Sequence, residues 1–184
     1  MARIVKTKPF MTGYKSYIKS LSIEYAEYLA NWYNDEEVTK YLVRGIFPIT
    51  KDSISKAIEL SVASDNEFEF IVFDKETDTP IGVVGLHNVN WIARNTECRT
   101  FIGNKEFWAK GYGTEITDLM LKYAFNMLNI NKVSLGVNEE NIAAVKTYQK
   151  VGFKKEGVLR EYIYRNNKYY NVILMSILKK EYLR

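Results

Sequence analysis

The chain has 184 residues, 47% of them hydrophobic and 26% charged, which is enough for one domain built around a single core. The net charge of +4 comes from 26 basic and 22 acidic residues that are interspersed, so it suits acidic ligands without indicating a nucleic-acid surface. Cys98 is the only cysteine and His87 the only histidine, which excludes an intramolecular disulfide, a multi-cysteine zinc site and a two-histidine metal site.

The sequence predicts neither a membrane span nor a signal peptide. Its longest apolar stretches fall far short of the roughly 20 residues that a membrane helix needs. Residues 1–9 interrupt their apolar positions with Arg3, Lys6 and Lys8. With no repeats and only 3 prolines, we expect one domain over residues 1–184, with its core at about 14–182. The single cysteine fits a reducing compartment, so we expect a cytoplasmic location.

The first half of the chain alternates between helical and extended patterns. Ser22 is a candidate N-cap for the first helix, and Thr50 or Asp52 for a later one. Period-two and buried apolar runs predict three neighbouring strands in the centre, which we expect to be antiparallel. The elements predicted here are a strand over 14–21, helices over 22–34 and 36–42, a helix from about 50 to 62, and strands over 68–73, 81–89 and 97–103.

The second half predicts two helices and three strands. Gly152 suits the C-terminal end of the second helix, and Asn166-Asn167 suits a tight turn because asparagine tolerates positive φ. The elements are helices over 113–129 and 141–150 and strands over 133–137, 155–164 and 169–178. The whole pattern predicts an α/β fold whose central, mostly antiparallel sheet has about seven strands flanked by helices.

A glycine-rich turn between a strand and a helix is the most informative segment. Residues 108–114 read Trp-Ala-Lys-Gly-Tyr-Gly-Thr and follow the strand that ends at Gly103. Glycines let the backbone approach a phosphate, and the first N–H groups of a helix are unpaired and carry partial positive charge. Two glycines also serve an ordinary tight turn, so this segment alone leaves an anion site and a plain turn open.

The spacing of the glycines excludes two familiar phosphate loops. No segment supplies the G-x-x-x-x-G-K-[ST] of a Walker loop. A dinucleotide fold needs a third glycine where Ile116 stands. The turn therefore predicts a cradle for the pyrophosphate of some other cofactor.

A second motif lies further along, where residues 141–153 fit N-x-x-A-x-x-x-Y-x-x-x-G-F, from Asn141 to Phe153. With both motifs at this separation, the chain resembles the GNAT superfamily of acyl-CoA-dependent N-acyltransferases over nearly all of residues 14–182. Its nearest branch contains ribosomal-protein N-terminal acetyltransferases and spermidine acetyltransferase. That superfamily usually has Gln or Arg where Trp108 stands, although this branch often carries Trp. The resemblance implies a sheet splayed between its fourth and fifth strands, here 97–103 and 133–137, with the cofactor in the gap.

The resemblance also implies the cofactor contacts. The backbone of 109–114 would bind the pyrophosphate of acetyl-CoA, and the end of strand 97–103 would lie along the pantetheine and polarise the thioester through a backbone N–H. Asn141 would hold pantetheine or the neighbouring strand end. The cofactor-binding residues expected on this basis are Phe101, Ile102, Gly103, Trp108, Ala109, Lys110, Gly111, Tyr112, Gly113, Thr114, Asn141 and Tyr148.

Two residues are candidates for proton transfer. An amine of pKa ~10 must lose a proton before it attacks, and a thiolate of pKa ~8.5 must be stabilised as it leaves. Glu97 matches a glutamate common in this branch and is the candidate base, directly or through water. A strand-pairing surface glutamate is the alternative. Tyr148 is the candidate acid beside the CoA sulfur, and the alternative is one more packing tyrosine among 14.

Other polar residues favour structural roles. His87 lies among valines and leucines and is expected to be a hydrogen-bonded strand residue rather than a base. Glu36 and Glu37 could meet a cationic substrate, but acidic residues also start helices favourably. The tyrosines of the C-terminal hairpin could line an acceptor cleft or simply pack.

These observations predict an N-acetyltransferase that catalyses direct attack by a primary amine in a ternary complex, with no metal. A non-catalytic CoA-binding or protein-interaction module on the same fold is the alternative, and an RNA-binding protein lacks a concentrated basic stripe. The acceptor stays open between a protein N-terminus and a small-molecule amine, because acceptor choice lies in variable loops. An exposed edge strand near the C-terminus makes a homodimer an expectation.

Overall fold

A single mixed sheet organises the protein, for which a computed structural model describes residues 8–43 and 45–182. Its strand order is β1-β2-β3-β4-β5-β6-β8-β7, and all neighbours are antiparallel except β5 and β6. The strands are β1 (Met11–Thr12), β2 (Ser16–Ser20), β3 (Phe68–Asp74), β4 (Pro80–Asn90), β5 (Asn95–Ile102), β6 (Lys132–Asn138), β7 (Lys154–Arg165) and β8 (Lys168–Leu178).

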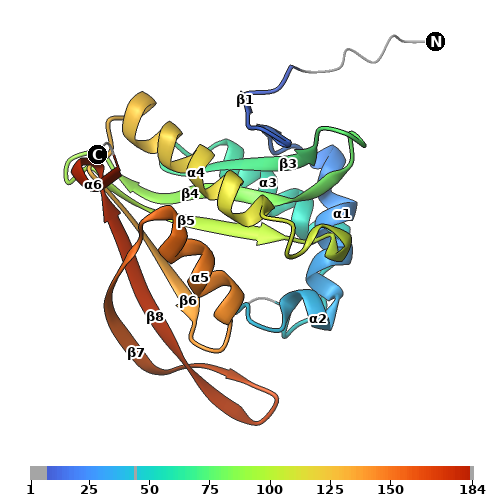
Figure 1. Ribbon diagram of the computed structural model, residues 1–184. Coiled ribbons are helices and arrows are strands. Elements are labelled where there is room, and N and C mark those ends of the chain that lie inside the picture. The colour runs from blue at the N-terminus through green and yellow to red at the C-terminus, as the bar shows by residue number, and fades with distance from the viewer. Residues whose placement is uncertain (1–7, 44, 183–184) are drawn as a thin grey trace.

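Helices cover both faces of this sheet. In Figure 1, α4 and α5 lie in front of the strands and α3 lies behind them. The buried apolar side chains form two clusters, one beneath α4 and α5 and one beneath α1 and α3. The helical segments are η1 (Ile23–Tyr25), α1 (Ala26–Asn34), α2 (Glu36–Thr39), α3 (Lys51–Val62), η2 (Lys105–Phe107), α4 (Tyr112–Lys122), η3 (Tyr123–Met127), α5 (Ile142–Val151) and α6 (Lys179–Tyr182). No helix among residues 8–43 and 45–182 is long and apolar enough to cross a membrane.

Local signals fix several of these elements as the sequence predicts. Thr50 caps α3, with Ser53 completing a capping box. Asn141 caps α5 by accepting a hydrogen bond from the N–H of Ala144. Gly152 ends the same helix with φ +110°, a conformation that glycine adopts without strain. The α/β fold and its mostly antiparallel sheet are therefore confirmed.

Three details of the prediction were wrong. The sheet has eight strands rather than about seven, because the two-residue β1 is too short to show a pattern. Ser22 makes no capping bond to a backbone N–H, since its hydroxyl donates to Glu24. The helix predicted over 113–129 changes to a wider π-helical turn at Tyr123, where the N–H of Leu128 donates to the Tyr123 carbonyl.

The strands β5 and β6 separate, as the family resemblance implied. Their parallel pairing covers only three positions, from Asn95 with Lys132 to Glu97 with Ser134. Beyond this point β5 stays paired with β4, and β6 stays paired with β8. Figure 1 shows the two strands running apart, with α5 in front of them. The sheet is therefore open between Cys98–Ile102 on one side and Leu135–Asn138 on the other.

Candidate active site

The turn before α4 has the backbone geometry of an anion cradle. Ala109 and Gly111 have φ of +56° and +81°, so the chain reverses twice within three residues. The indole N–H of Trp108 donates to the carbonyl of Ile102 at 2.9 Å and ties the turn to the end of β5. The resemblance left Trp108 without a side-chain role, and this hydrogen bond gives it one.

The first N–H groups of α4 lie at this turn. Gly111 precedes the helix and offers no side-chain cap, and its carbonyl accepts the first helical bond from the N–H of Glu115 at 3.2 Å. The N–H groups of Tyr112, Gly113 and Thr114 therefore precede the helical ladder. Together with the helix dipole they provide directed donors for a phosphate.

Tyr148 reaches across the opening to β5. It belongs to α5, which follows β6, yet its hydroxyl lies near the side chains of Thr100 and Cys98, both on β5. Its side chain is only 9% exposed, and burial raises the pKa of its phenol well above the usual value. Burial likewise raises the pKa of the Cys98 thiol, to about 12. Both groups stay protonated at physiological pH.

Two threonines link Tyr148 to the cradle. The hydroxyls of Thr100 and Thr117 are 3.3 Å apart, and Thr117 donates to the carbonyl of Gly113 at 2.7 Å. Thr147, beside Tyr148 on α5, also faces Gly113, since its Cγ2 lies 3.7 Å from where a Cβ on that glycine would be. The structure thus brings both sequence motifs into one site.

The end of β5 offers Ile102 as the backbone donor toward the opening. The N–H of Gly103 donates to Ile81 on β4, so it faces away from β6. Because neighbouring residues of a strand direct their backbone groups to opposite sides, the N–H of Ile102 faces the opening. The backbone groups of Phe101 face β4, as those of Gly103 do. Its ring stacks on that of Tyr33, with the ring centres 5.0 Å apart. Among the three predicted residues here, Ile102 alone can polarise a thioester from its N–H.

Asn141 lies where α5 begins. Its side-chain oxygen accepts from Ala144 at 3.1 Å, and its N–H donates to the carbonyl of Asn138 at the end of β6. The residue therefore joins the helix carrying Tyr148 to one side of the opening.

Glu97 lies on the opposite face of β5 from Thr100. Arg99 binds its carboxylate through both nitrogens of a fork, at 2.8 and 3.0 Å, and Asn88 lies 3.4 Å away. Hydrogen bonding to Arg99 is the main reason why the pKa of Glu97 is below its usual value. The carboxylate is thus ionised, and the ion pair with Arg99 makes it a weaker base than a free glutamate.

The histidine neighbouring Glu97 is held by two carboxylates. His87 pairs with Glu97 across β4 and β5, is 6% exposed, and has Glu67 and Glu69 at 3.7 and 3.6 Å. Burial lowers its pKa below the usual value. This environment is that of a partnered strand residue, as the sequence favoured.

Tyr148 and Glu97 therefore approach the opening from opposite faces. Cys98, Thr100 and Ile102 lie on the face covered by α4 and α5, whereas Phe101 packs in the cluster beneath α1 and α3. A coenzyme lying between the strands can present its thioester to Tyr148 from one face while an amine reaches it from the other. Such an arrangement fits direct transfer in a ternary complex.

Helix α2 connects η2, just beyond β5, with the β7–β8 hairpin. Lys105 of η2 forms ion pairs with Asp35 and Glu37 at 2.8 and 2.9 Å. From the β7–β8 hairpin, the buried Arg165 donates to the carbonyl and hydroxyl of Thr39 and to other backbone carbonyls nearby. Helix α2 is thus fixed from both directions.

Sequence reasoning missed four residues around this site: Lys15, Thr100, Thr117 and Arg165. Their contacts join segments far apart in the chain, such as Arg165 with Thr39, 126 residues away. Neither periodicity nor a motif marked any of them.

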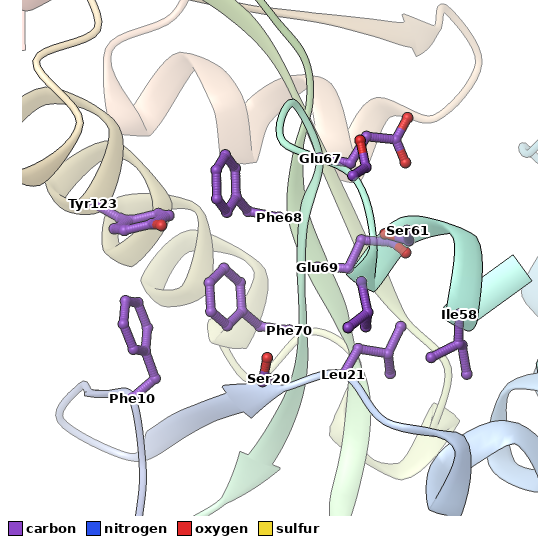
Figure 2. A pocket seen from close by; sticks show the side chains of 12 residues that line it. Phe10, Ser20, Leu21, Ile58, Ser61, Glu67, Phe68, Glu69, Phe70 and Tyr123 are labelled. Atoms are coloured by element: carbon purple, nitrogen blue, oxygen red, sulfur yellow. The ribbon is translucent and has the colours of Figure 1, made fainter.

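A separate hollow of about 250 Å³ lies at the far end of β3 (Figure 2). The rings of Phe10, Phe68, Phe70 and Tyr123 lie on one side of the strand, and Glu67, Glu69 and Ser61 on the other. It contains neither the cradle nor Tyr148. In the described part of the chain, no three histidine, cysteine or acidic side chains gather as metal ligands.

Comparison with known proteins agrees with this geometry. Residues 17–154 match the family model described as an acetyltransferase (GNAT) domain. An uncharacterized N-acetyltransferase, p20 of Bacillus licheniformis, is 32% identical over 90% of this chain and 93% of its own length. The spermidine N(1)-acetyltransferase of Vibrio cholerae is 33% identical over 72% of this chain and 75% of its own.

A solved structure extends the likeness to three dimensions. The crystal structure of spermidine N-acetyltransferase from Vibrio cholerae, in complex with CoA and spermine, superposes with a TM-score of 0.86. It is 28% identical in sequence and covers 92% of this chain and 99% of that one. A chain with this fold, cradle and match is an acyltransferase.

The chain belongs to the GNAT acetyltransferase family. It is an acetyl-CoA-dependent N-acetyltransferase, and an amine is its acceptor.

Proposed function

We propose that the acceptor is a small-molecule primary amine of the polyamine type. One observation carries this proposal: Glu67, Glu69 and Glu97 lie around His87 on one face of the sheet, next to the hollow that Glu67 and Glu69 also line, and they outnumber Arg99, the cation that acts on this histidine. Three carboxylates on one face favour a ligand with several positive charges. The likeness to spermidine N-acetyltransferases supports the same class.

In the proposed mechanism, Glu97 takes the amine proton. The carboxylate is ionised and accepts the proton directly or through water, although the ion pair with Arg99 lowers its pKa and makes it a weaker base. The amine nitrogen then bonds to the acetyl carbon and releases its second proton to solvent before the carbon–sulfur bond breaks, while the N–H of Ile102 stabilises the negative charge that develops on the carbonyl oxygen.

Tyr148 acts on the leaving sulfur. As the carbon–sulfur bond breaks, its hydroxyl donates a hydrogen bond to the developing thiolate. Its raised pKa makes complete proton transfer to sulfur uphill, so hydrogen bonding supplies most of the stabilisation. The hydroxyl of Thr100 lies beside it in this mechanism.

The coenzyme contacts of the proposal follow the cradle. The N–H groups of residues 109–114 bind the pyrophosphate, with the charge of Lys110 nearby and the indole of Trp108 bracing the turn. Phe101, Ile102 and Gly103 lie along the pantetheine, and Asn141 fixes its far side. We also propose that residues 1–184 form a single domain, that the protein is cytoplasmic and that it forms a homodimer through the edge strand β7.

An acceptor screen tests the proposal. The protein is incubated with acetyl-CoA and spermidine, an amino sugar, an aminoglycoside or a peptide with a free N-terminus, and free thiol and acetylated product are measured. We expect thiol release matched by N-acetylspermidine. If the peptide alone is acetylated, the acceptor is a protein N-terminus and the polyamine proposal is wrong. CoA binding without any product would favour the non-catalytic module.

A further inference from the structure

A lysine from the start of β2 lies over the cradle. The ammonium of Lys15 donates to the carbonyl of Lys110 and lies 4.5 Å from the centre of the Tyr112 ring. It is also 3.4 Å from where a Cβ on Gly111 would stand, with no other heavy atom within 4 Å of that point. A positive charge thus borders the open side of the turn, in the direction from which an anion would approach.

Glu115 holds the backbone of this lysine in place. Its carboxylate accepts the N–H of Lys15 at 3.1 Å and both the N–H and the hydroxyl of Ser16, at 2.9 and 2.6 Å. A Cβ on Gly13 would overlap this carboxylate, so a side chain there would displace Glu115. Since Glu115 belongs to the first turn of α4, the start of β2 is fixed directly to the helix that forms the cradle.

Charges of both signs surround the start of α4. Lys75 donates to the carbonyls of Gly13 and Tyr14 at 2.9 and 3.1 Å, and Lys110 lies within the turn itself. The hydrogen bonds to the Glu115 carboxylate come from two backbone N–H groups and a hydroxyl. The ammonium of Lys15 is not among these donors, so it can interact with a bound anion. Among these three lysines, the ammonium of Lys15 is the one in contact with the turn, since that of Lys110 lies over Phe107, and the carboxylates of Asp74, Glu76 and Glu115 lie around Tyr112.

We propose that Lys15 binds a phosphate of the nucleotide half of CoA. The inference rests on the proposed placement of the pyrophosphate at residues 109–114. β2 lies beyond β3 and β4 from the opening, so Lys15 approaches the cradle from the side away from Tyr148. It therefore contacts phosphate and leaves the pantetheine and the thioester untouched.

The test is the Kd of CoA measured by calorimetry in Lys15→Met. We expect a rise of about tenfold, with a weaker dependence on salt than in the wild type, because one charge-assisted contact is lost. Lys15→Arg should stay within about threefold of the wild type, since it keeps the charge. Lys19→Met is the matched control: this lysine of β2 lies over Tyr17 and Phe73, in the cluster on the other face.

Repeating the measurement with 3′-dephospho-CoA identifies the phosphate. If Lys15→Met also weakens the binding of 3′-dephospho-CoA, Lys15 contacts the pyrophosphate. If it weakens the binding of CoA alone, Lys15 contacts the 3′-phosphate. Both results support the proposal. A CoA Kd unchanged in Lys15→Met, or raised equally in Lys19→Met, would overturn it. Wild-type protein that binds no CoA would instead refute the placement of the coenzyme. Thermal melting without ligand checks that each variant is folded.

Discussion

Tyr148 is the residue on which the proposed chemistry most depends. Replacing it with phenylalanine removes the hydroxyl beside Thr100 and keeps the ring that packs against Phe153. We expect the single-turnover rate to fall about 10²-fold, at the low end for acid catalysis, while the Kd of acetyl-CoA changes little. Rapid-quench kinetics with the amine found in the screen measures both quantities.

Tyr17 provides the control for this substitution. It is similarly buried, and its hydroxyl bonds to Asp78, far from the opening. Tyr17→Phe should leave the chemical step unchanged. If Tyr148→Phe also reacts at the wild-type rate, the role of acid must be withdrawn from Tyr148.

The role of Glu97 should be visible in the pH dependence of kcat/KM. Because Arg99 lowers its pKa, this carboxyl remains ionised down to acidic pH, whereas the free amine becomes scarce as pH falls. Glu97→Gln should therefore lower kcat/KM most at low pH, by about 10²-fold, and much less near the pKa of the amine. The measurement is a full pH profile beside Glu76→Gln, which makes the same charge change in the β3–β4 turn. A loss of equal size at every pH would indicate positioning, and no loss would leave Glu97 as a strand residue.

At the scale of elements, the cradle depends on one backbone conformation. Gly111 has φ +81°, and a side chain there would project beside Lys15 into otherwise open space. Gly111→Val should raise the Kd of acetyl-CoA by about tenfold or more, because it strains the turn and places methyl groups where phosphate approaches. Gly157→Val on β7 is the control, since nothing lies within 4 Å of its added Cβ. Unchanged affinity in a folded Gly111→Val protein would remove the cradle from the mechanism.

The hairpin and α2 form a second element-scale unit, which we propose lies on the side from which the amine approaches. Arg165 satisfies the carbonyls of Thr39, Leu42 and Gly45 with a planar fork that lysine cannot reproduce. Arg165→Lys should therefore leave α2 less ordered. If a tenth of the molecules keep the ordered segment, the KM for the amine rises roughly tenfold, while kcat and the affinity for acetyl-CoA stay the same. Arg160→Lys, on the same strand, is the matched control. A fall in kcat at saturating amine with an unchanged KM would contradict this role.

The sequence predicted the parts of these elements that depend on local signals. The cap at Thr50, the glycine at 152 and the two motifs are each contained within a few residues. Contacts that cross the fold left no such trace: Lys15 meets Lys110 across 95 positions. The strand β1 was not predicted, because two residues are too few to show an alternating pattern.

For the whole molecule, the sequence predicted the layers but could not show how the opening is used. The separation of β5 from β6 followed from family resemblance, and the structure adds that Tyr148 and Glu97 lie on opposite faces of the same strand. That arrangement depends on which residues of β5 face α4 and α5, a consequence of register that no motif encodes.

The most direct test of the account is a crystal structure of the protein with CoA. We predict that the pyrophosphate binds at the N–H groups of Tyr112, Gly113 and Thr114. The pantetheine should run between β5 and β6, and the sulfur should lie within hydrogen-bond distance of the Tyr148 hydroxyl. CoA bound elsewhere, for instance in the hollow of Figure 2, or lying in the opening with its sulfur away from Tyr148, would contradict the proposed site.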